Sequence, residues 1–298
     1  MTTATTPLPS PPSTPTRRAA SWLHRRPRIR LLGLLSGPVA WLVVIYLGSL
    51  AILFINAFYT RDAFSGQIIA EPTLANFAEV LQDPYPGITL RTVLMAVAVT
   101  LTCAVLAVPI AFFMARVVPP RWRGTMVVAV IVPLWASYLI KIYAWRLILA
   151  EEGILNQFLA PFGLQGPGFG DVAVWLAFTY LWLPYMILPV YAGFDRIPDS
   201  LLEASADLGG HAWMTFRRVV LPLVLPAIVA GSIFTFSLTL GDYIAPAQLS
   251  TTIFIGNAIY STFGGGNLPL AAALSLVPLG IVVLYLVVAR RLGAFEAL

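Results

Sequence analysis

Few side chains of this sequence are able to do chemistry. Among 298 residues there is one lysine, Lys141, one cysteine, Cys103, and two distant histidines, His24 and His211. A phosphate-binding loop of the G-x-x-x-x-G-K-[ST] type needs a lysine directly after its glycines, and Lys141 lies in "LIKIYAW" instead. The histidines and the cysteine match no familiar metal-ligand spacing. The sequence therefore predicts no nucleotide hydrolysis through such a loop, no metal site and no cofactor.

Carboxylates are the remaining candidates, and they avoid the interior of the long apolar stretches. Acidic side chains inside membrane spans usually mark proton relays or ion sites of secondary transporters. Because the acids here lie at the ends of apolar stretches, we expect a non-catalytic protein, with an ion-coupled secondary transporter as an alternative. These acids include Asp62, Glu71, Glu79, Asp83, Glu151, Glu152, Asp171 and Asp242.

The elements that must position these residues are apolar helices. Hydrophobic residues make up 59% of the chain and charged residues only 10%, whereas a soluble domain carries about 25% charged residues. Uncharged stretches recur at lengths that suit membrane spans of about 20 residues, so we predict an all-α polytopic membrane protein. Six transmembrane helices are expected near residues 36–58, 90–115, 124–148, 172–193, 219–241 and 269–289.

The segments around these helices differ in composition. Residues 1–35 form a basic tail rich in Pro, Ser and Thr, which cannot bury a core and is expected to be disordered. Residues 242–268 contain many small polar residues and are interpreted as a loop or re-entrant segment. The transmembrane domain then covers residues 36–291, and residues 292–298 are a short C-terminal end.

Basic residues indicate the orientation in the membrane. Arginine and lysine collect in the cytoplasmic loops of membrane proteins. Fourteen of the 18 basic residues lie in the N-terminal tail, in the second and fourth connections and at the C-terminus. We therefore expect both termini in the cytoplasm. The net charge of +5 is explained by this topology, and we expect no binding of nucleic acid.

A compact polar segment, residues 195–218, interrupts the apolar sequence on the predicted cytoplasmic side. Ser200 and Glu203 have the spacing of a helix capping box, and Gly209 is placed to close the helix in a left-handed conformation. One side of this helix is apolar with small residues in its middle, which suits docking into a groove of another protein; a helix lying on the membrane is the alternative. This face consists of Leu201, Ala204, Ser205 and Leu208, at the helical spacing i, i+3, i+4, i+7.

The residues in and after this helix form a spaced motif: Glu203, Ala204, Ser205, Gly209, Val219, Leu221 and Pro222. The motif resembles the "EAA…G…I-LP" loop of ABC-importer permeases, with Ser205 in place of alanine and Val219 in place of isoleucine. The resemblance implies that residues 195–218 are a cytoplasmic coupling loop that contacts a dimer of ATP-binding-cassette ATPases. It also implies that ATP is hydrolysed by that separate partner chain.

Three further segments are "TLANF" at 73–77, "PLWASYLIKIYAWRLILAEEGILN" at 133–156 and "YLWLPYMILPVYAGFDRIP" at 180–198. They resemble spermidine/putrescine-type permeases, in particular the first of the two paired permease subunits. The resemblance covers roughly residues 36–291 and implies the type I ABC-importer permease fold in a bacterial inner membrane. It implies a heterodimer with a second permease subunit and a small cationic amine delivered by an extracytoplasmic solute-binding protein. Related permeases are similar to carriers of opines and aminophosphonates, which are alternative solutes.

A cationic amine needs carboxylates and aromatic faces along its path, because aromatic rings attract cations. Asp242 ends the fifth predicted helix near the outer mouth, and Tyr243 follows it. Tyr and Trp also collect in belts at the membrane interfaces, which is the alternative explanation for the aromatic residues. The candidate residues of the substrate path are Asp242, Tyr243, Trp135, Tyr138 and Tyr185.

Overall fold

The computed structural model describes residues 27–62 and 65–293. Regular structure in this part of the chain is helical apart from a two-stranded antiparallel ribbon, β1 (Thr60–Arg61) and β2 (Ile68–Ile69). The chain divides into two compact units, residues 1–55 and 56–298. The first contains one helical run, and the second contains the other helices and the ribbon.

The first unit is an apolar helical run made of α2 (Pro27–Trp41), the π-helical η1 (Leu42–Leu47) and α3 (Gly48–Asn56). Within the described residues the run is already helical at Pro27, before the predicted start at residue 36. The predicted disorder of the tail concerns mainly residues 1–26, which lie outside the described residues together with most of the tail arginines.

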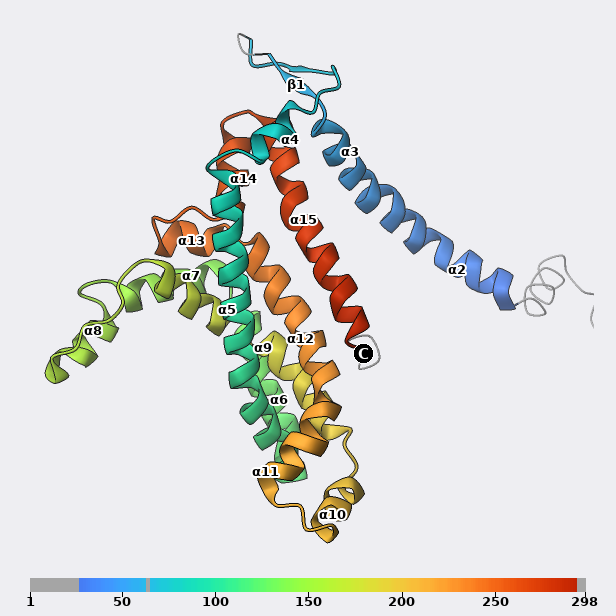
Figure 1. Ribbon diagram of the computed structural model, residues 1–298, viewed down its shortest axis with the longest axis vertical. Coiled ribbons are helices and arrows are strands. Elements are labelled where there is room, and N and C mark those ends of the chain that lie inside the picture. Colours follow the sequence, from blue (N-terminus) through green and yellow to red (C-terminus); the bar gives the residue numbers. More distant parts are fainter. Residues whose placement is uncertain (1–26, 63–64, 294–298) are drawn as a thin grey trace, which may run out of the picture. The chain divides into compact units, whose positions relative to one another are not determined.

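The core of the second unit consists of three long helices that pack against one another: α5 (Tyr85–Phe112), α9 (Asp171–Asp195) and α12 (Leu221–Gly241) (Figure 1). Close approach of α9 and α12 depends on a glycine. A Cβ atom added to Gly193 would lie 2.7 Å from the Cβ of Ala227. Small residues at helix crossings allow this spacing in membrane proteins, so this contact fixes how tightly the two helices pack.

Shorter elements complete the second unit, and α15 packs against α4, α12 and α14. Two of them, η2 and η4, are π-helical segments that continue α5 and precede α12. The bounds are α4 (Ala75–Val80), η2 (Phe113–Val117), α6 (Pro120–Trp135), α7 (Tyr138–Leu149), α8 (Ile154–Leu159), η3 (Ala160–Phe162), α10 (Asp199–Asp207), α11 (Ala212–Thr215), η4 (Phe216–Val220), α13 (Ile244–Leu249), α14 (Ile255–Gly264) and α15 (Leu268–Arg291).

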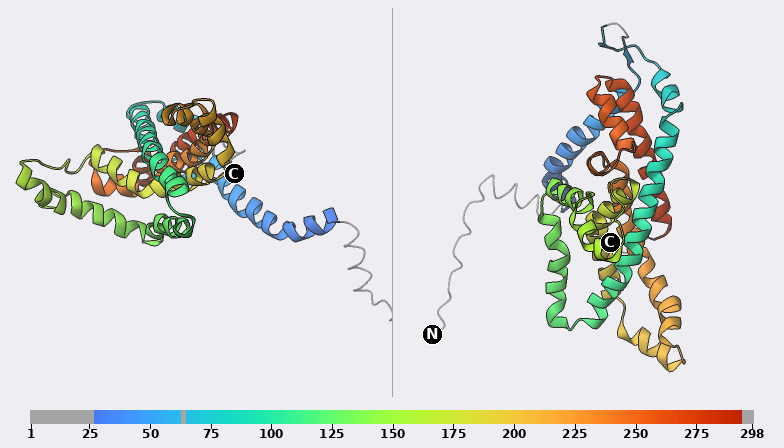
Figure 2. Two further views of the ribbon diagram at one scale, coloured as in Figure 1. Left: turned by 90° about the horizontal axis from the view of Figure 1, so that it is seen from below. Right: turned by 90° about the vertical axis from the view of Figure 1, so that its left-hand side faces the viewer.

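Five helical runs of the described chain are long and apolar enough to cross a membrane: 33–56, 85–117, 171–195, 212–241 and 268–291. The expected third crossing is different, because the chain bends by 88° between α6 and the run that starts at Tyr138 (Figure 2). The helical path is interrupted at Ala136 and Ser137, between the two helices, whose ψ angles are 142° and 134°. The bent pair makes a sixth crossing if both parts belong to one span.

The predicted loop or re-entrant segment, residues 242–268, contains α13 and α14, which are both too short to span a membrane. The start of α14 returns to the end of α12. A Cβ atom on Gly256 would lie 2.8 Å from the carbonyl oxygen of Asp242. The segment therefore folds back onto the end of α12 before the chain enters α15.

Candidate functional site

The loop of residues 195–218 lies at one end of the second unit, where a sharp turn joins α10 to α11 (Figure 1). The predicted closure of α10 is confirmed, because Gly209 has a left-handed φ of 79°. Gly210 N–H donates to the Ser205 carbonyl at 2.8 Å, and Gly209 N–H donates to the Ala206 carbonyl at 2.9 Å, the Schellman pattern of a helix end. A Cβ atom on Gly210 would lie 2.6 Å from the Ser205 carbonyl oxygen. Both glycines are therefore needed, one for its φ and the other for close approach.

The predicted capping box at the start of α10 is wrong. Helix α10 begins at Asp199, and Pro198 occupies the N-cap position without a side-chain cap. Its φ of −66° and ψ of 140° lead the chain into the helix ahead of Ser200, which consequently lies in the first turn. Asp199 instead places a negative charge in the first turn, where it interacts favourably with the helix dipole.

Two arginines, Arg116 of η2 and Arg123 of α6, hold the start of this loop. The Arg116 guanidinium donates to Asp199 Oδ1 at 2.6 Å and to two carbonyl oxygens near the end of α9. Arg123 forms a longer ion pair with Asp195 at 3.4 Å. Only 17% of the Arg116 side chain is exposed, whereas Asp199 is 79% exposed, so solvent screens the ion pair and the part-buried bonds to the two carbonyl oxygens are the better protected ones. These contacts place the two connections on the same side, in agreement with the charge pattern.

The predicted docking face of α10 is exposed. Leu208 is 88% exposed, and Leu201 and Ala204 are exposed as well. Trp213 in α11 adds another large exposed apolar side chain, and Glu203 is exposed on the same helix. The loop thus exposes several apolar side chains and one acidic side chain on its surface.

The other motif residues have structural positions. The Ser205 hydroxyl lies 2.7 Å from the Thr215 hydroxyl, so it joins α10 to α11 and does not extend the apolar face. Leu221 and Pro222 occupy the first turn of α12. The motif therefore combines an exposed face on α10 with a turn that is held by hydrogen bonds between α10 and α11 and within the turn itself.

At the other end of α12, the structure brings together two residues of the predicted substrate path. The hydroxyl of Tyr138 on α7 donates to Oδ2 of Asp242. Oδ1 accepts the backbone N–H groups of Ile244 at 2.9 Å and Ala245 at 3.0 Å. Burial raises the pKa of the Asp242 carboxyl, although these hydrogen bonds lower it. The ion pairs of the described residues lie elsewhere, so an ionised Asp242 has no counter-charge there.

Aromatic rings continue from Tyr138 along α9. Trp182 stacks on Tyr138 with ring centroids 6.1 Å apart, and Tyr185 lies against Trp182 at 6.0 Å. Phe234 of α12 in turn stacks on Tyr185 at 6.2 Å. Tyr185 is thus linked to Asp242 through Trp182, which was not among the predicted site residues. The helical spacing of Trp182 and Tyr185 on one side of α9 was the available signal.

Tyr243 belongs to a neighbouring pair, and Trp135 is not joined to the cluster. Tyr243 stacks on Tyr260 of α14 at 4.6 Å, and Asn257 Nδ2 donates to the Tyr243 carbonyl at 2.8 Å. Trp135 ends α6 and is 87% exposed. The bend after Trp135 turns α7, and with it Tyr138, in another direction.

Two polar atoms in these clusters are buried without a partner in the described part of the chain: Asn257 Oδ1 and the indole N–H of Trp182. Such atoms are costly unless another group satisfies them, by about 1–3 kcal/mol each. Asn257 Oδ1 is an acceptor and suits an ammonium donor, whereas the Trp182 N–H needs an oxygen.

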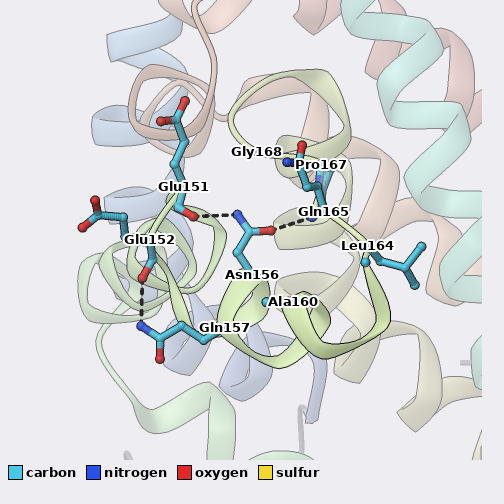
Figure 3. A pocket seen from close by; sticks show the side chains of 11 residues that line it. Glu151, Glu152, Asn156, Gln157, Ala160, Leu164, Gln165, Pro167 and Gly168 are labelled. Atoms are coloured by element: carbon cyan, nitrogen blue, oxygen red, sulfur yellow. Dashed lines mark hydrogen bonds between the residues drawn. The ribbon is translucent and has the colours of Figure 1, made fainter.

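An open pocket of about 860 Å³ lies in the connection between α7 and α9 (Figure 3). The Asn156 amide donates to the Glu151 carbonyl at 2.9 Å and accepts the Gly166 N–H at 2.6 Å, and the Gln157 amide donates to the Glu152 carbonyl at 3.0 Å. The carboxylates of Glu151 and Glu152 point away from these amides (Figure 3) and are exposed. The loop is therefore held by amide side chains while its two acids stay accessible.

Residues 107–295 match the protein family described as "Binding-protein-dependent transport system inner membrane component". The chain belongs to this family. The permease is 45% identical over 308 residues to "Inner membrane ABC transporter permease protein YdcU" of Escherichia coli (strain K12), with 98% of each chain covered. It is 33% identical over 234 residues to "Spermidine/putrescine transport system permease protein PotB" of Escherichia coli (strain K12), covering 76% of the permease and 83% of that relative.

Solved structures with the same fold are also ABC transporters. The permease superposes on a chain of a bacterial ABC transporter involved in the import of alginate with a TM-score of 0.71 at 18% identity, covering 92% of the permease and 99% of that chain. For the MetNI methionine ABC transporter the TM-score is 0.56 at 16% identity, covering 73% and 100%. The protein is therefore a multi-pass ABC-importer permease subunit with the type I fold, as the sequence motif predicted, and its role is transport.

Proposed function

We propose that this permease forms half of the translocation pathway of an importer for small cationic amines of the spermidine/putrescine class. The observation that carries the proposal is the Asp242 carboxylate, which is held by Tyr138, bordered by aromatic rings and without a basic partner among residues 27–62 and 65–293. An ammonium group supplies the missing counter-charge. Aromatic faces add cation–π attraction of about 0.5–2 kcal/mol, and the name of the PotB relative supports the same class of solute.

Asn257 Oδ1 supports a substrate with more than one ammonium group. It is a buried acceptor without a donor among the described residues, and its side chain is held at the carbonyl of Tyr243, the residue next to Asp242. A diamine reaches two acceptors with its two ends, whereas a monoamine reaches only one. We therefore expect putrescine or spermidine to be preferred over a monoamine of similar length.

A second class of solute is favoured by Trp182. Its buried indole N–H has no acceptor in the described part of the chain, and a fully protonated polyamine offers none. An amine that also carries an oxygen, such as an opine or an aminophosphonate, satisfies both this donor and Asp242. Competition between labelled spermidine and such a solute separates the two classes.

Uptake of labelled putrescine or spermidine by cells that produce the full transporter tests the path. Asp242→Asn removes the charge but keeps the size, and is expected to lower uptake roughly tenfold, since a charge-assisted contact contributes about 1.5–3 kcal/mol. Asp242→Glu is expected to retain part of the activity. Pull-down of the partner subunits is the control, and normal uptake by the Asn variant would remove Asp242 from the path.

The loop of residues 195–218 is, in this proposal, the coupling loop for a cytoplasmic dimer of ATP-binding-cassette ATPases. Its exposed apolar face, Leu201, Ala204 and Leu208, is covered by the partner, and Glu203 faces a basic or hydrogen-bonding group there. Glu203→Arg is expected to insert normally but to lose ATPase association and stimulated hydrolysis. Glu79→Arg is the matched control, since it makes the same charge change at an exposed position of α4, outside the loop of residues 195–218.

The remaining partners follow from the arrangement of the second unit. The pocket with Glu151 and Glu152 connects to the start of α9, and the coupling loop follows its end, so the two lie about 35 Å apart along the helix. We place the pocket on the extracytoplasmic side, facing the solute-binding protein, and both termini in the cytoplasm of a bacterial cell. A second permease subunit completes the heterodimer in the bilayer. Accessibility of a C-terminal tag from outside intact cells would contradict this orientation.

A further inference from the structure

An apolar groove of about 630 Å³ lies between α5 and α9, away from both sites described above. Its walls are Leu94, Met95 and Ala98 from α5 and Val172 and Trp175 from α9. Leu94 and Val172 are exposed. The groove is large enough for part of an acyl chain and open to the outside of the helix bundle.

Two opposite charges, Arg91 and Asp171, also line the groove. Both stand at the boundary of an uncharged stretch, since residues 92–115 and 172–194 contain no charged side chain. The boundary of such a stretch lies at the level of the lipid headgroups. The two charges therefore face the headgroup layer, with the apolar walls extending below it toward the bilayer core.

The two charged side chains do not bind each other. Arg91 and Asp171 form no ion pair in the described chain. Asp171 Oδ1 accepts only a long hydrogen bond from the Ser250 hydroxyl at 3.3 Å, and Arg91 is exposed without a hydrogen-bond partner among the described residues. An uncharged helix laid over the groove would leave a guanidinium and a carboxylate in apolar surroundings, which is costly.

We propose that the groove binds one zwitterionic phospholipid that carries a primary ammonium group, of the phosphatidylethanolamine class. Its phosphate binds Arg91, because a guanidinium forms paired hydrogen bonds with phosphate oxygens. Its ammonium group donates to Asp171, and an acyl chain lies along Leu94, Ala98 and Trp175. Phosphatidylcholine lacks the N–H donors for Asp171, and phosphatidylglycerol lacks the cation.

Lipid retention by the complete transporter tests the proposal. The purified complex is equilibrated in detergent with phosphatidylethanolamine, phosphatidylcholine and phosphatidylglycerol in turn, and bound lipid is counted by native mass spectrometry. We expect one phosphatidylethanolamine to be retained by the parent complex. Arg91→Gln is expected to lower this occupancy about tenfold, because it removes a charge-assisted contact.

Two further variants distinguish the contribution of the lipid headgroup to binding from that of the acyl chain. Asp171→Asn keeps the oxygen that accepts from Ser250 and is expected to abolish the preference for phosphatidylethanolamine over phosphatidylcholine. Leu94→Trp fills the groove and is expected to displace the lipid. Leu101→Trp makes the same change on the same side of α5 but outside the groove, and is expected to leave occupancy unchanged.

Three outcomes would overturn the proposal. Equal retention in the parent, Arg91→Gln and Leu94→Trp complexes means that the lipid binds elsewhere. Equal retention of all three lipids by the parent means that the charges do not select a headgroup. Loss of the second permease subunit from the Leu94→Trp complex, with lipid retained, means that protein covers the groove. None of these readouts depends on the transported solute, so failure here is distinct from failure of the proposed function.

Discussion

The proposed coupling loop and the Asp242 cluster lie near opposite ends of α12, about 30 Å apart along the helix, and they are held by different kinds of contact. The loop is closed by backbone hydrogen bonds between residues at most five positions apart, at Gly209 and Gly210. The cluster depends on side chains that are 104 positions apart, Tyr138 and Asp242. The turn in the loop is a local structure, because its hydrogen bonds join near neighbours in the sequence. The cluster exists only while α7 and α12 keep their present arrangement, so movement of these helices changes it directly.

We expect the largest effect from a substitution that disrupts the turn at Gly209. Gly209→Val places a β-branched residue at a φ of 79°, which costs about 1–3 kcal/mol and opens the Schellman turn. We expect insertion into the membrane to be normal and ATPase stimulation to be lost. Gly209→Asn is the matched control, because asparagine tolerates the left-handed conformation. Stimulation at the parental level in the valine variant would show that the turn is not needed for coupling.

A smaller effect is expected from the link between the loop and the helix core. Arg116→Ala removes the bonds to Asp199 and to two carbonyl oxygens, a loss of about 1.5–3 kcal/mol for a charged donor. We expect a lower Tm of the purified complex and several-fold weaker ATPase association. Arg121→Ala, at an exposed arginine in the first turn of α6, is the control and should change neither. Equal Tm values for both variants would mean that the loop holds its position without Arg116.

The cluster is tested by a double-mutant cycle. Tyr138→Phe removes only the hydroxyl that donates to Asp242 and is expected to lower uptake several-fold, in line with a hydrogen bond to a charged group of about 1.5–3 kcal/mol. If the two side chains act as a pair, Tyr138→Phe combined with Asp242→Asn should be no worse than Asp242→Asn alone. Additive losses would show that each residue acts independently of their hydrogen bond.

We expect the smallest effect in a comparison of substitutions at two tryptophans, Trp135 and Trp182. Trp135 was predicted to line the path, yet it is 87% exposed, whereas only 8% of Trp182 is exposed and it stacks on Tyr138. Trp135→Leu is expected to change uptake less than about twofold, as is usual for exposed positions without contacts. Trp182→Leu should lower it several-fold. A larger loss of uptake in Trp135→Leu than in Trp182→Leu would show that Trp135, and not Trp182, lines the substrate path.

Predictions from the sequence succeeded where the signal was local. The length of uncharged stretches indicated the spans, and the double glycine indicated the end of α10, whose last residue, Asp207, lies two positions before Gly209. The capping box failed because Pro198 took the N-cap position, a competition among adjacent residues that spacing alone does not resolve. The bend of 88° after α6 was missed because the apolar pattern continues through Ala136 and Ser137 without interruption.

The sequence by itself determined the membrane class, the approximate spans and the coupling motif, since hydrophobic length and glycine conformation are properties of neighbouring residues. Only the tertiary structure decided that Arg116 holds the loop, that Tyr138 and not Trp135 reaches Asp242, and that Arg91 and Asp171 share one groove. Each of these contacts joins residues roughly 80 or more positions apart. Their formation depends on how each helix is rotated and packed against its neighbours, which an almost uniformly apolar helix surface specifies only weakly.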